Sequence, residues 1–154
     1  MTANKLFRDW VVGDLADGAT QKALLYFPKA AILTEVAAVN GAAIAAHATA
    51  VASVTVTNKG TDGSGTTVVA VITNDSDLAD SATRNSAAYV ANDALVVDLS
   101  HNNTSVAAVA GNEHISGTAI AAGSVLEVAV VNALGGATAL QDFTVSLGFR
   151  EGTN

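Results

Sequence analysis

Hydrophobic and polar residues alternate along the chain in short runs, most regularly in residues 143–149. There, the apolar side chains of Phe143, Val145, Leu147 and Phe149 alternate with threonine, serine and glycine. A period of two residues places successive side chains on opposite faces of a β-strand. We therefore predict a strand near the end of the chain with one buried face and one polar or small face.

Seven other runs rich in valine, leucine, isoleucine or threonine have the length of strands, and turn residues bound most of them. They cover residues 6–12, 23–27, 32–39, 50–57, 66–73, 94–99 and 125–131. The glycine-rich residues 58–65 predict a hairpin loop between two of these runs. Residues 132–136 contain Asn132 and a glycine pair, and they predict either a hairpin or a crossing between sheets.

No run shows a sustained helical period with caps at both ends. The best helix candidate is the alanine-rich residues 41–52, but β-branched residues follow it at once. Residues 36–58 carry no acid, lysine or arginine and are long enough to cross a bilayer. They also contain several polar residues, and their apolar part is mostly alanine, so two strands are the favoured interpretation. Residues 74–89 are polar and predict a long exposed loop.

Eight predicted strands in 154 residues indicate a single all-β domain. The strand number and the turn signals favour an antiparallel two-sheet sandwich that is jelly-roll-like, with about eight strands. Residues 1–12 are expected to form an N-terminal arm or the first strand. Residues 13–154 are expected to form the single β-sandwich domain.

The amino-acid composition indicates an interaction surface. Half of the residues are hydrophobic, yet 5% are aromatic and 14% are charged, and 32 are alanine. Charged residues usually make up about a quarter of a soluble domain. With a mean hydropathy of +0.39, a free monomer would expose much semi-apolar surface, and such surface usually marks contact sites. We therefore expect an oligomer or a subunit bound to a larger particle.

The charge balance excludes some partners. A net charge of -7 and a pI near 4.6 argue against nucleic acid and anionic membranes, because phosphate binding needs a basic face. The absence of cysteine excludes disulfides and cysteine-based zinc sites. The first ten residues mix charged and aromatic side chains and lack the apolar segment of a signal peptide.

No motif predicts a catalytic residue, a cofactor-binding residue or a metal ligand. His47, His101 and His114 have no metal-site spacing and are interpreted as isolated side chains. Asp75, Asp77 and Asp80 form the best calcium candidate, although the segment 75–80 lacks the central glycine and closing glutamate of an EF-hand. A solvated acidic loop is the favoured interpretation of this segment.

The sequence supports a phosphate-binding or hydrolytic site equally little. The glycines in residues 62–65 and 135–136 lack phosphate-loop spacing and are interpreted as turns. There is no GxSxG motif, and nothing singles out a pair among the fourteen acids for glycoside hydrolysis. Trp10 is interpreted either as a plug at the end of the sandwich or as a docking residue, with the plug favoured.

Four segments carry a resemblance to a known family. They are Thr55-Val-Thr-Asn-Lys-Gly60, Gly63-Ser-Gly-Thr-Thr67, Ile120-Ala-Ala-Gly-Ser-Val-Leu126 and the alternating run that ends at Phe149. In this order, and with the alanine, valine, threonine and glycine bias, the chain resembles the jelly-roll head decoration (capsid cement) proteins of tailed bacteriophages. The resemblance covers about the last two-thirds of the chain.

The resemblance implies a structural role in a virion. Such a protein is made in the host cytoplasm and binds the capsid exterior as a homotrimer, where it bridges neighbouring subunits of the major capsid protein. It implies no enzymatic activity and no cofactor. Within the N-terminal arm, the distinctive residues Phe7, Arg8 and Trp10 are the expected contacts with the capsid or a neighbouring copy.

Two other function classes remain as alternatives. A phage fibre or host-recognition module that binds glycans would present a groove with aromatic residues, and the low aromatic content speaks against it. A small glycan hydrolase would present a pocket with acids of perturbed pKa, which no motif predicts.

Overall fold

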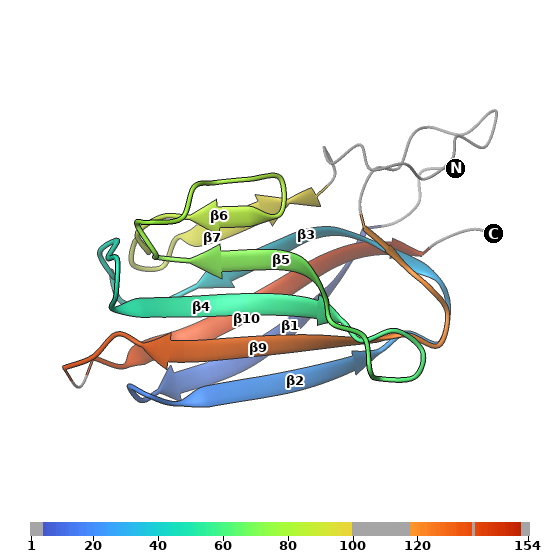
Figure 1. Cartoon of the computed structure of the whole chain (residues 1–154), viewed down its shortest axis with the longest axis horizontal. Helices are drawn as coiled ribbons and strands as arrows, with labels where there is room; N and C mark the ends of the chain where they lie inside the picture. The colour runs from blue at the N-terminus through green and yellow to red at the C-terminus, as the bar shows by residue number, and fades with distance from the viewer. Residues whose placement is uncertain (1–4, 100–117, 137, 152–154) are drawn as a thin grey trace.

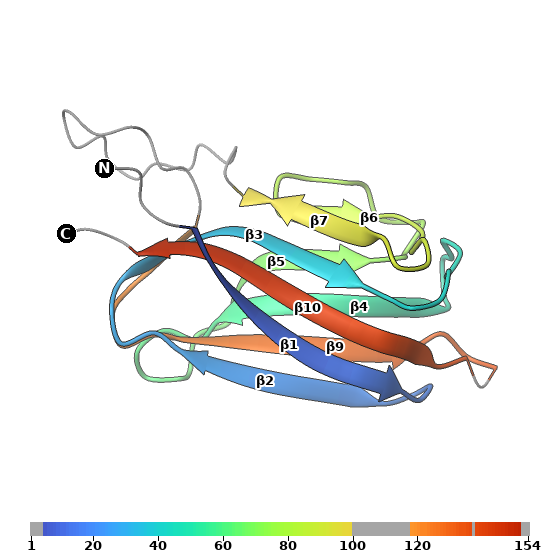
Figure 2. The same ribbon diagram turned by 180° about the vertical axis from the view of Figure 1, so that it is seen from behind.

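The computed structural model describes residues 5–99, 118–136 and 138–151, which form ten β-strands and no helix. The strands are β1 (Lys5–Leu15), β2 (Thr20–Tyr26), β3 (Ala31–Val39), β4 (Val51–Asn58), β5 (Thr67–Thr73), β6 (Arg84–Ser86), β7 (Ala94–Asp98), β8 (Thr118–Ile120), β9 (Val125–Ala133) and β10 (Leu140–Glu151). They build two five-stranded sheets, which lie one behind the other in Figure 1 and, from the opposite side, in Figure 2.

The strand order is that of a jelly roll. One sheet, called sheet A here, has the order β1-β10-β3-β7, with β8 also paired to β3, and sheet B has the order β2-β9-β4-β5-β6. Four antiparallel pairs are nested along the chain: β1 with β10, β2 with β9, β3 with β7, and β4 with β5. Such nested antiparallel pairs arise when one long hairpin folds over on itself to form two sheets. The predicted all-β two-sheet sandwich is confirmed.

The predicted number of about eight strands was wrong, because the described residues form ten. The eight predicted runs coincide with the eight longer strands, and the two that were missed, β6 and β8, have three residues each. Three residues are too few to show an alternation, and β6 is Arg-Asn-Ser with no apolar side chain. β6 lies inside residues 74–89, which were predicted as loop, and pairs parallel to β5.

Two ambiguous segments are resolved by the sheet pairing. Residues 36–58 contain the end of β3 and the whole of β4, as the strand interpretation predicted. No helix in the described part of the chain is long and apolar enough to cross a membrane. β4 and β5 form the predicted hairpin around the glycine-rich loop, whereas the chain crosses between the sheets from β9 to β10.

From residue 5 onward, the segment expected to be an arm or a first strand forms β1 in sheet A. β1 pairs with β10 from Lys5 to Leu15, so the strand continues past residue 12. The pairing shifts register on both sides of Gly13, whose φ is 72°. A positive φ suits glycine, because a side chain is strained there, and the two shifts bend the end of this edge strand.

The core lies between the sheets and follows the alternation seen in the sequence. In β10 the side chains of Phe143, Val145, Leu147 and Phe149 are all buried, as predicted. In sheet B, alternate residues of β4 and β9 point into the same core and are also buried or nearly so. Several alanines also lie in this core, namely Ala31, Ala38, Ala52 and Ala70, so part of the alanine content fills narrow places between the sheets.

Tyr89 brings an unpaired polar atom into the core. Its ring packs edge-to-face on Phe143 at a centroid distance of 5.9 Å, and its hydroxyl has no hydrogen-bond partner among the described residues. Burial raises the pKa of this phenol above its usual value, because the charged form is poorly solvated there.

Replacing Tyr89 with phenylalanine is expected to raise the free energy of unfolding by about 1 kcal/mol, because it removes an unsatisfied buried hydroxyl and keeps the ring. Urea unfolding followed by circular dichroism measures this change. The control is Tyr26→Phe, which removes a hydroxyl from an exposed side chain and is expected to leave stability unchanged. A Tyr89→Phe protein less stable than the parent would show that the hydroxyl makes a favourable contact.

Candidate functional site

The three residues predicted as contacts do not form one patch. In β1, Phe7 pairs with Gly148 on the outer face of sheet A and is 52% exposed. Arg8 and Trp10 pair with two buried residues of β10, Leu147 and Val145, so their side chains leave the strand on the inner face. Trp10 is partly buried against the core, which agrees with the plug interpretation.

Arg8 covers one end of the core. Its guanidinium carbon lies 5.2 Å from the ring centre of Phe27 and 5.5 Å from that of Phe149. The two rings meet edge-to-face at 5.5 Å. A cation over aromatic faces is attracted by their quadrupoles, so this contact ties β1 to β10 and to the residue after β2. Of the three predicted residues, only Phe7 is directed to the outer face of the sandwich.

The outer face of sheet A combines apolar and acidic side chains. Because directly paired residues share a face, its rows run from β1 through β10 and β3 to β7. They are Phe7–Gly148–Glu35–Asp98, Asp9–Ser146–Ala37–Val96 and Val11–Thr144–Val39–Ala94. The exposed apolar side chains among them belong to Phe7, Val11 and Val96. Three acids, Asp9, Glu35 and Asp98, lie in these rows, and the next row along β10 adds the positive charge of Arg150.

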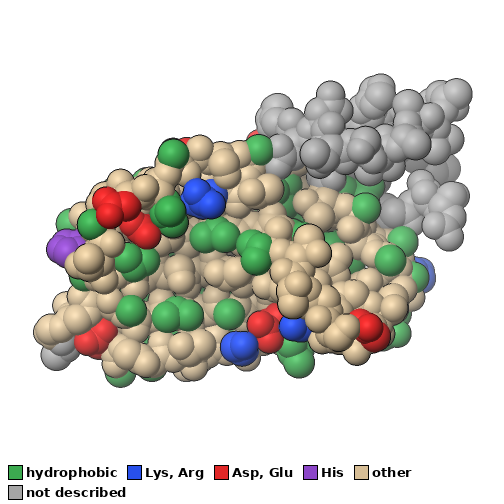
Figure 3. Space-filling model, viewed as in Figure 1, with side chains coloured by type: hydrophobic (Ala, Val, Ile, Leu, Met, Phe, Trp, Pro, Cys, Tyr) green, Lys and Arg blue, Asp and Glu red, His purple; other side chains and the backbone are tan. Residues whose placement is uncertain are grey.

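The outer face of sheet B is almost uncharged. Its rows run from β2 through β9 and β4 to β5 and are Thr20–Val131–Ser53–Thr73, Lys22–Ala129–Thr55–Val71 and Leu24–Glu127–Thr57–Val68. The two charges in these rows neutralise each other, since Lys22 Nζ lies 3.3 Å from Glu127 Oε1. At the edge of the sheet, β6 adds Arg84, which pairs with Val71. In the space-filling view of this face, uncharged atoms occupy the centre and most charged side chains lie toward its margins (Figure 3).

Exposed apolar side chains are also present on this face. Leu24 and Tyr26 of β2 are 67% and 57% exposed, and Val68 of β5 is also exposed. Between them lie the small side chains of alternating serine, threonine, alanine and valine residues in β4 and β9. From β2 to β5 the face therefore offers a broad surface of small side chains, which a partner can approach closely without burying an unpaired charge.

Three buried asparagines hold the loops at one end of the sandwich. Asn40 follows β3, Asn74 follows β5 and Asn132 lies near the end of β9, and each is almost completely buried. Asn132 donates from Nδ2 to the carbonyls of Leu15 and Thr138, at 2.8 and 3.0 Å. Because these amides are engaged within the protein, they stabilise loops and are not offered to a ligand.

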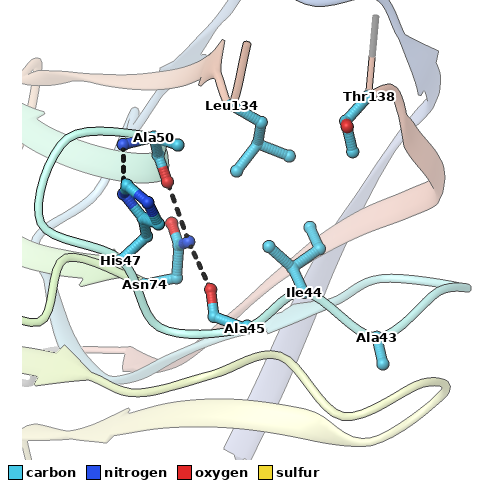
Figure 4. Close-up of a pocket in the computed structure, with 8 residues that line it drawn as sticks. All are labelled: Ala43, Ile44, Ala45, His47, Ala50, Asn74, Leu134 and Thr138. Carbon is cyan, nitrogen blue, oxygen red and sulfur yellow. Dashed lines mark hydrogen bonds between the residues drawn. The ribbon is translucent and has the colours of Figure 1, made fainter. Parts of the chain in front are cut away.

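A small cavity of about 230 Å³ lies at the same end, beside Asn74 and His47 (Figure 4). Its other lining residues are three alanines together with Ile44, Leu134 and Thr138. The Nδ1 atom of His47 accepts hydrogen bonds from the backbone N–H groups of Thr49 and Ala50, at 3.0 and 2.9 Å. His47 thus shapes its own loop. No acid lines the cavity, and Thr138 lies on the opposite side of it from His47 (Figure 4).

The acidic segment does not gather its carboxylates around one point. Asp75 accepts a hydrogen bond from the N–H of Asp77, and Asp80 accepts one from the N–H of Ser86, so each caps a nearby turn. Among the described residues, no three side chains of histidine, aspartate or glutamate are placed to hold a metal ion. His101 and His114 lie outside the described residues.

The groups with shifted pKa values do not mark a pocket either. Hydrogen bonds from the N–H and the hydroxyl of Ser64 lower the pKa of Asp62. Asp62 is fully exposed in the loop between β4 and β5, and Tyr89 is sealed in the core. Neither shifted group lies where a substrate would meet a second reactive group, which is the arrangement that catalysis requires.

Sequence reasoning missed the uncharged face of sheet B and the three asparagines. The signal for the asparagines was weak, because each stands where a strand meets a turn and asparagine is common in turns. The face becomes visible only when the neighbours of each strand are known. Comparisons with protein-family models, with curated proteins and with solved structures found no match.

Proposed function

We propose that the protein is a structural, non-enzymatic component of a virion that binds the exterior of a phage capsid and bridges neighbouring capsid subunits. The observation that carries the proposal is the outer face of sheet B, where the rows from β2 to β5 contain only the mutually bound charges of Lys22 and Glu127. A further charge, that of Arg84 in β6, lies at the edge of this face. Burying such a face costs little desolvation and lets two surfaces lie close together. The partners are the major capsid protein and further copies of this chain, for which the resemblance implies a homotrimer.

The jelly roll supports this role mechanically. Two sheets packed through one continuous core give a stiff plate, and a plate that spans a boundary between subunits opposes their separation. The glycan-binding alternative gains less support, because the exposed aromatics Phe7 and Tyr26 lie in different sheets. The two therefore line no common groove.

The test is binding to empty shells assembled from the major capsid protein encoded beside this gene. The full chain is expected to co-sediment with the shells, to saturate, and to raise the temperature at which they break apart. Val68→Lys adds a charge on the outer face of sheet B and is expected to weaken binding at least about tenfold, a difference of about 1.4 kcal/mol. Val11→Lys makes the same change on the outer face of sheet A and is the control.

The outcomes separate the parts of the proposal. No binding to the shells, or no capsid gene beside this one, would contradict the capsid role. Binding that is lost in Val11→Lys or Phe7→Ala but kept in Val68→Lys would retain the role and move the contact to sheet A. Either result is read from the same sedimentation series.

A further inference from the structure

In the described part of the chain, β2 is an edge strand with few obstacles to pairing. It stands at the end of the strand order of sheet B, with β9 on its other side. Its pairing with β9 runs through all seven residues, Thr20 to Tyr26, without a register shift. The strand contains no proline and one charged residue, Lys22. Such an edge presents a row of unpaired backbone groups that is ready to accept another strand.

The other edges of the described sandwich are shorter or interrupted. β1 shifts register twice near its end, on both sides of Gly13. β6 and β8 have three residues each, and β7 has five and is tied to β6 by a hydrogen bond from Asn85 to the carbonyl of Val96. Bulges and short strands are the usual protections of an edge. β2 lacks both, and its lysine is held on the outer face by Glu127.

The hydrogen bonds at both ends of β2 show which backbone groups face outward. Phe27 N–H donates to the carbonyl of Ser124, and Asn132 N–H donates to the carbonyl of Ala19. Odd-numbered residues therefore bond to the β9 side, and in an antiparallel strand the alternate residues point the other way. The N–H and C=O groups directed to the open edge belong to Thr20, Lys22, Leu24 and Tyr26.

We propose that β2 pairs antiparallel with β2 of a second copy, about a two-fold axis at Ala23. This register places Lys22 opposite the partner's Leu24 and Thr20 opposite the partner's Tyr26, so the outward-facing residues of both copies exchange about eight backbone hydrogen bonds. All seven residues pair, and the two lysines do not face each other. A shift that set Lys22 against the partner's Lys22 would place like charges in direct opposition.

The pairing joins two copies of sheet B into one continuous ten-stranded sheet. The two uncharged outer faces then lie side by side and form a surface twice as wide. The use of this wider surface to bridge capsid subunits rests on the proposed function, whereas the contact between the two β2 strands does not. Because a two-fold contact closes with two copies, this edge builds a dimer, and the homotrimer implied by the resemblance would need a different surface.

The first test is the mass of the full chain in solution, combined with amide hydrogen exchange. A seven-residue strand pair is smaller than a standard interface, so sedimentation runs up to about 500 µM protein. We expect twice the 15.3 kDa of one chain. We also expect the amide hydrogens of Lys22 and Leu24 to exchange more slowly as concentration rises, while that of Ala23 is protected throughout.

Paired lysine substitutions identify the contact. Leu24→Lys sets a lysine opposite the partner's Lys22 and is expected to raise the dimer dissociation constant about tenfold or more. Within one copy the new lysine lies opposite Glu127, so a loss of pairing is not explained by a loss of folding, and thermal unfolding checks this. Val68→Lys, on the same face but in β5, is expected to leave the dimer intact.

The outcomes decide the proposal without reference to capsids. A monomer at the highest concentration, a trimer, or equal dissociation by both lysine variants would overturn the β2 contact. A dimer that Leu24→Lys alone dissociates would establish it, even if the protein bound no capsid. Conversely, a capsid-binding monomer would leave the proposed function standing and remove this contact.

Discussion

Replacing Asn74 with alanine is expected to lower the free energy of unfolding by about 3 kcal/mol, which corresponds to a fall in Tm of roughly 10 °C. The side chain is buried and makes three hydrogen bonds to backbone groups. Its Oδ1 accepts from the N–H of Ala52 at 2.7 Å, and its Nδ2 donates to the carbonyls of Ala45 and Ala50 at 2.8 and 3.2 Å. Alanine would leave these groups unpaired in a place that water reaches poorly.

The control is Asn58→Ala, which removes a side chain of the same type from the end of β4. Asn58 accepts one hydrogen bond, from the N–H of Gly60, so its replacement is expected to cost about 1 kcal/mol. Asn74→Asp keeps the acceptor for Ala52 but directs a carboxylate oxygen at two carbonyls, and it should also be strongly destabilising. Urea unfolding measures all three variants, and equal costs at Asn74 and Asn58 would contradict the role of Asn74.

Much of the sandwich was predictable because alternation is a local signal. The run from Phe143 to Phe149 reveals its buried face without knowledge of any partner strand, and the glycine-rich residues 58–65 mark a hairpin by themselves. β6 gave no such signal, since it is held by pairing to β5, by the hydrogen bond from Asn85 to β7 and by the turns of the acidic segment. Strands of that kind depend on neighbours that the sequence does not identify.

The candidate surface was less predictable, because it depends on which strands are neighbours. Lys22 and Glu127 are 105 residues apart in the chain, and only the pairing of β2 with β9 shows that they neutralise each other. The same applies to Phe7 and Arg8, which are adjacent in the sequence but lie on opposite faces of β1. Phe7, Arg8 and Trp10 were predicted as one group of contacts because they are close in the sequence. The strand instead places Phe7 on one face and the other two residues on the opposite face.

Phe143→Ala is expected to be the most destabilising single substitution, lowering the free energy of unfolding by about 4 kcal/mol. Phe143 is completely buried and packs edge-to-face on Tyr89, so its removal leaves a cavity between the sheets. Phe7→Ala is the matched control, because Phe7 is about half exposed on the outer face, and its cost should stay within about 0.5 kcal/mol. Thermal and urea unfolding of both variants measure the difference. Similar losses would mean that Phe7 belongs to the core, whereas the expected contrast would place Phe7 outside it, on the outer face of sheet A.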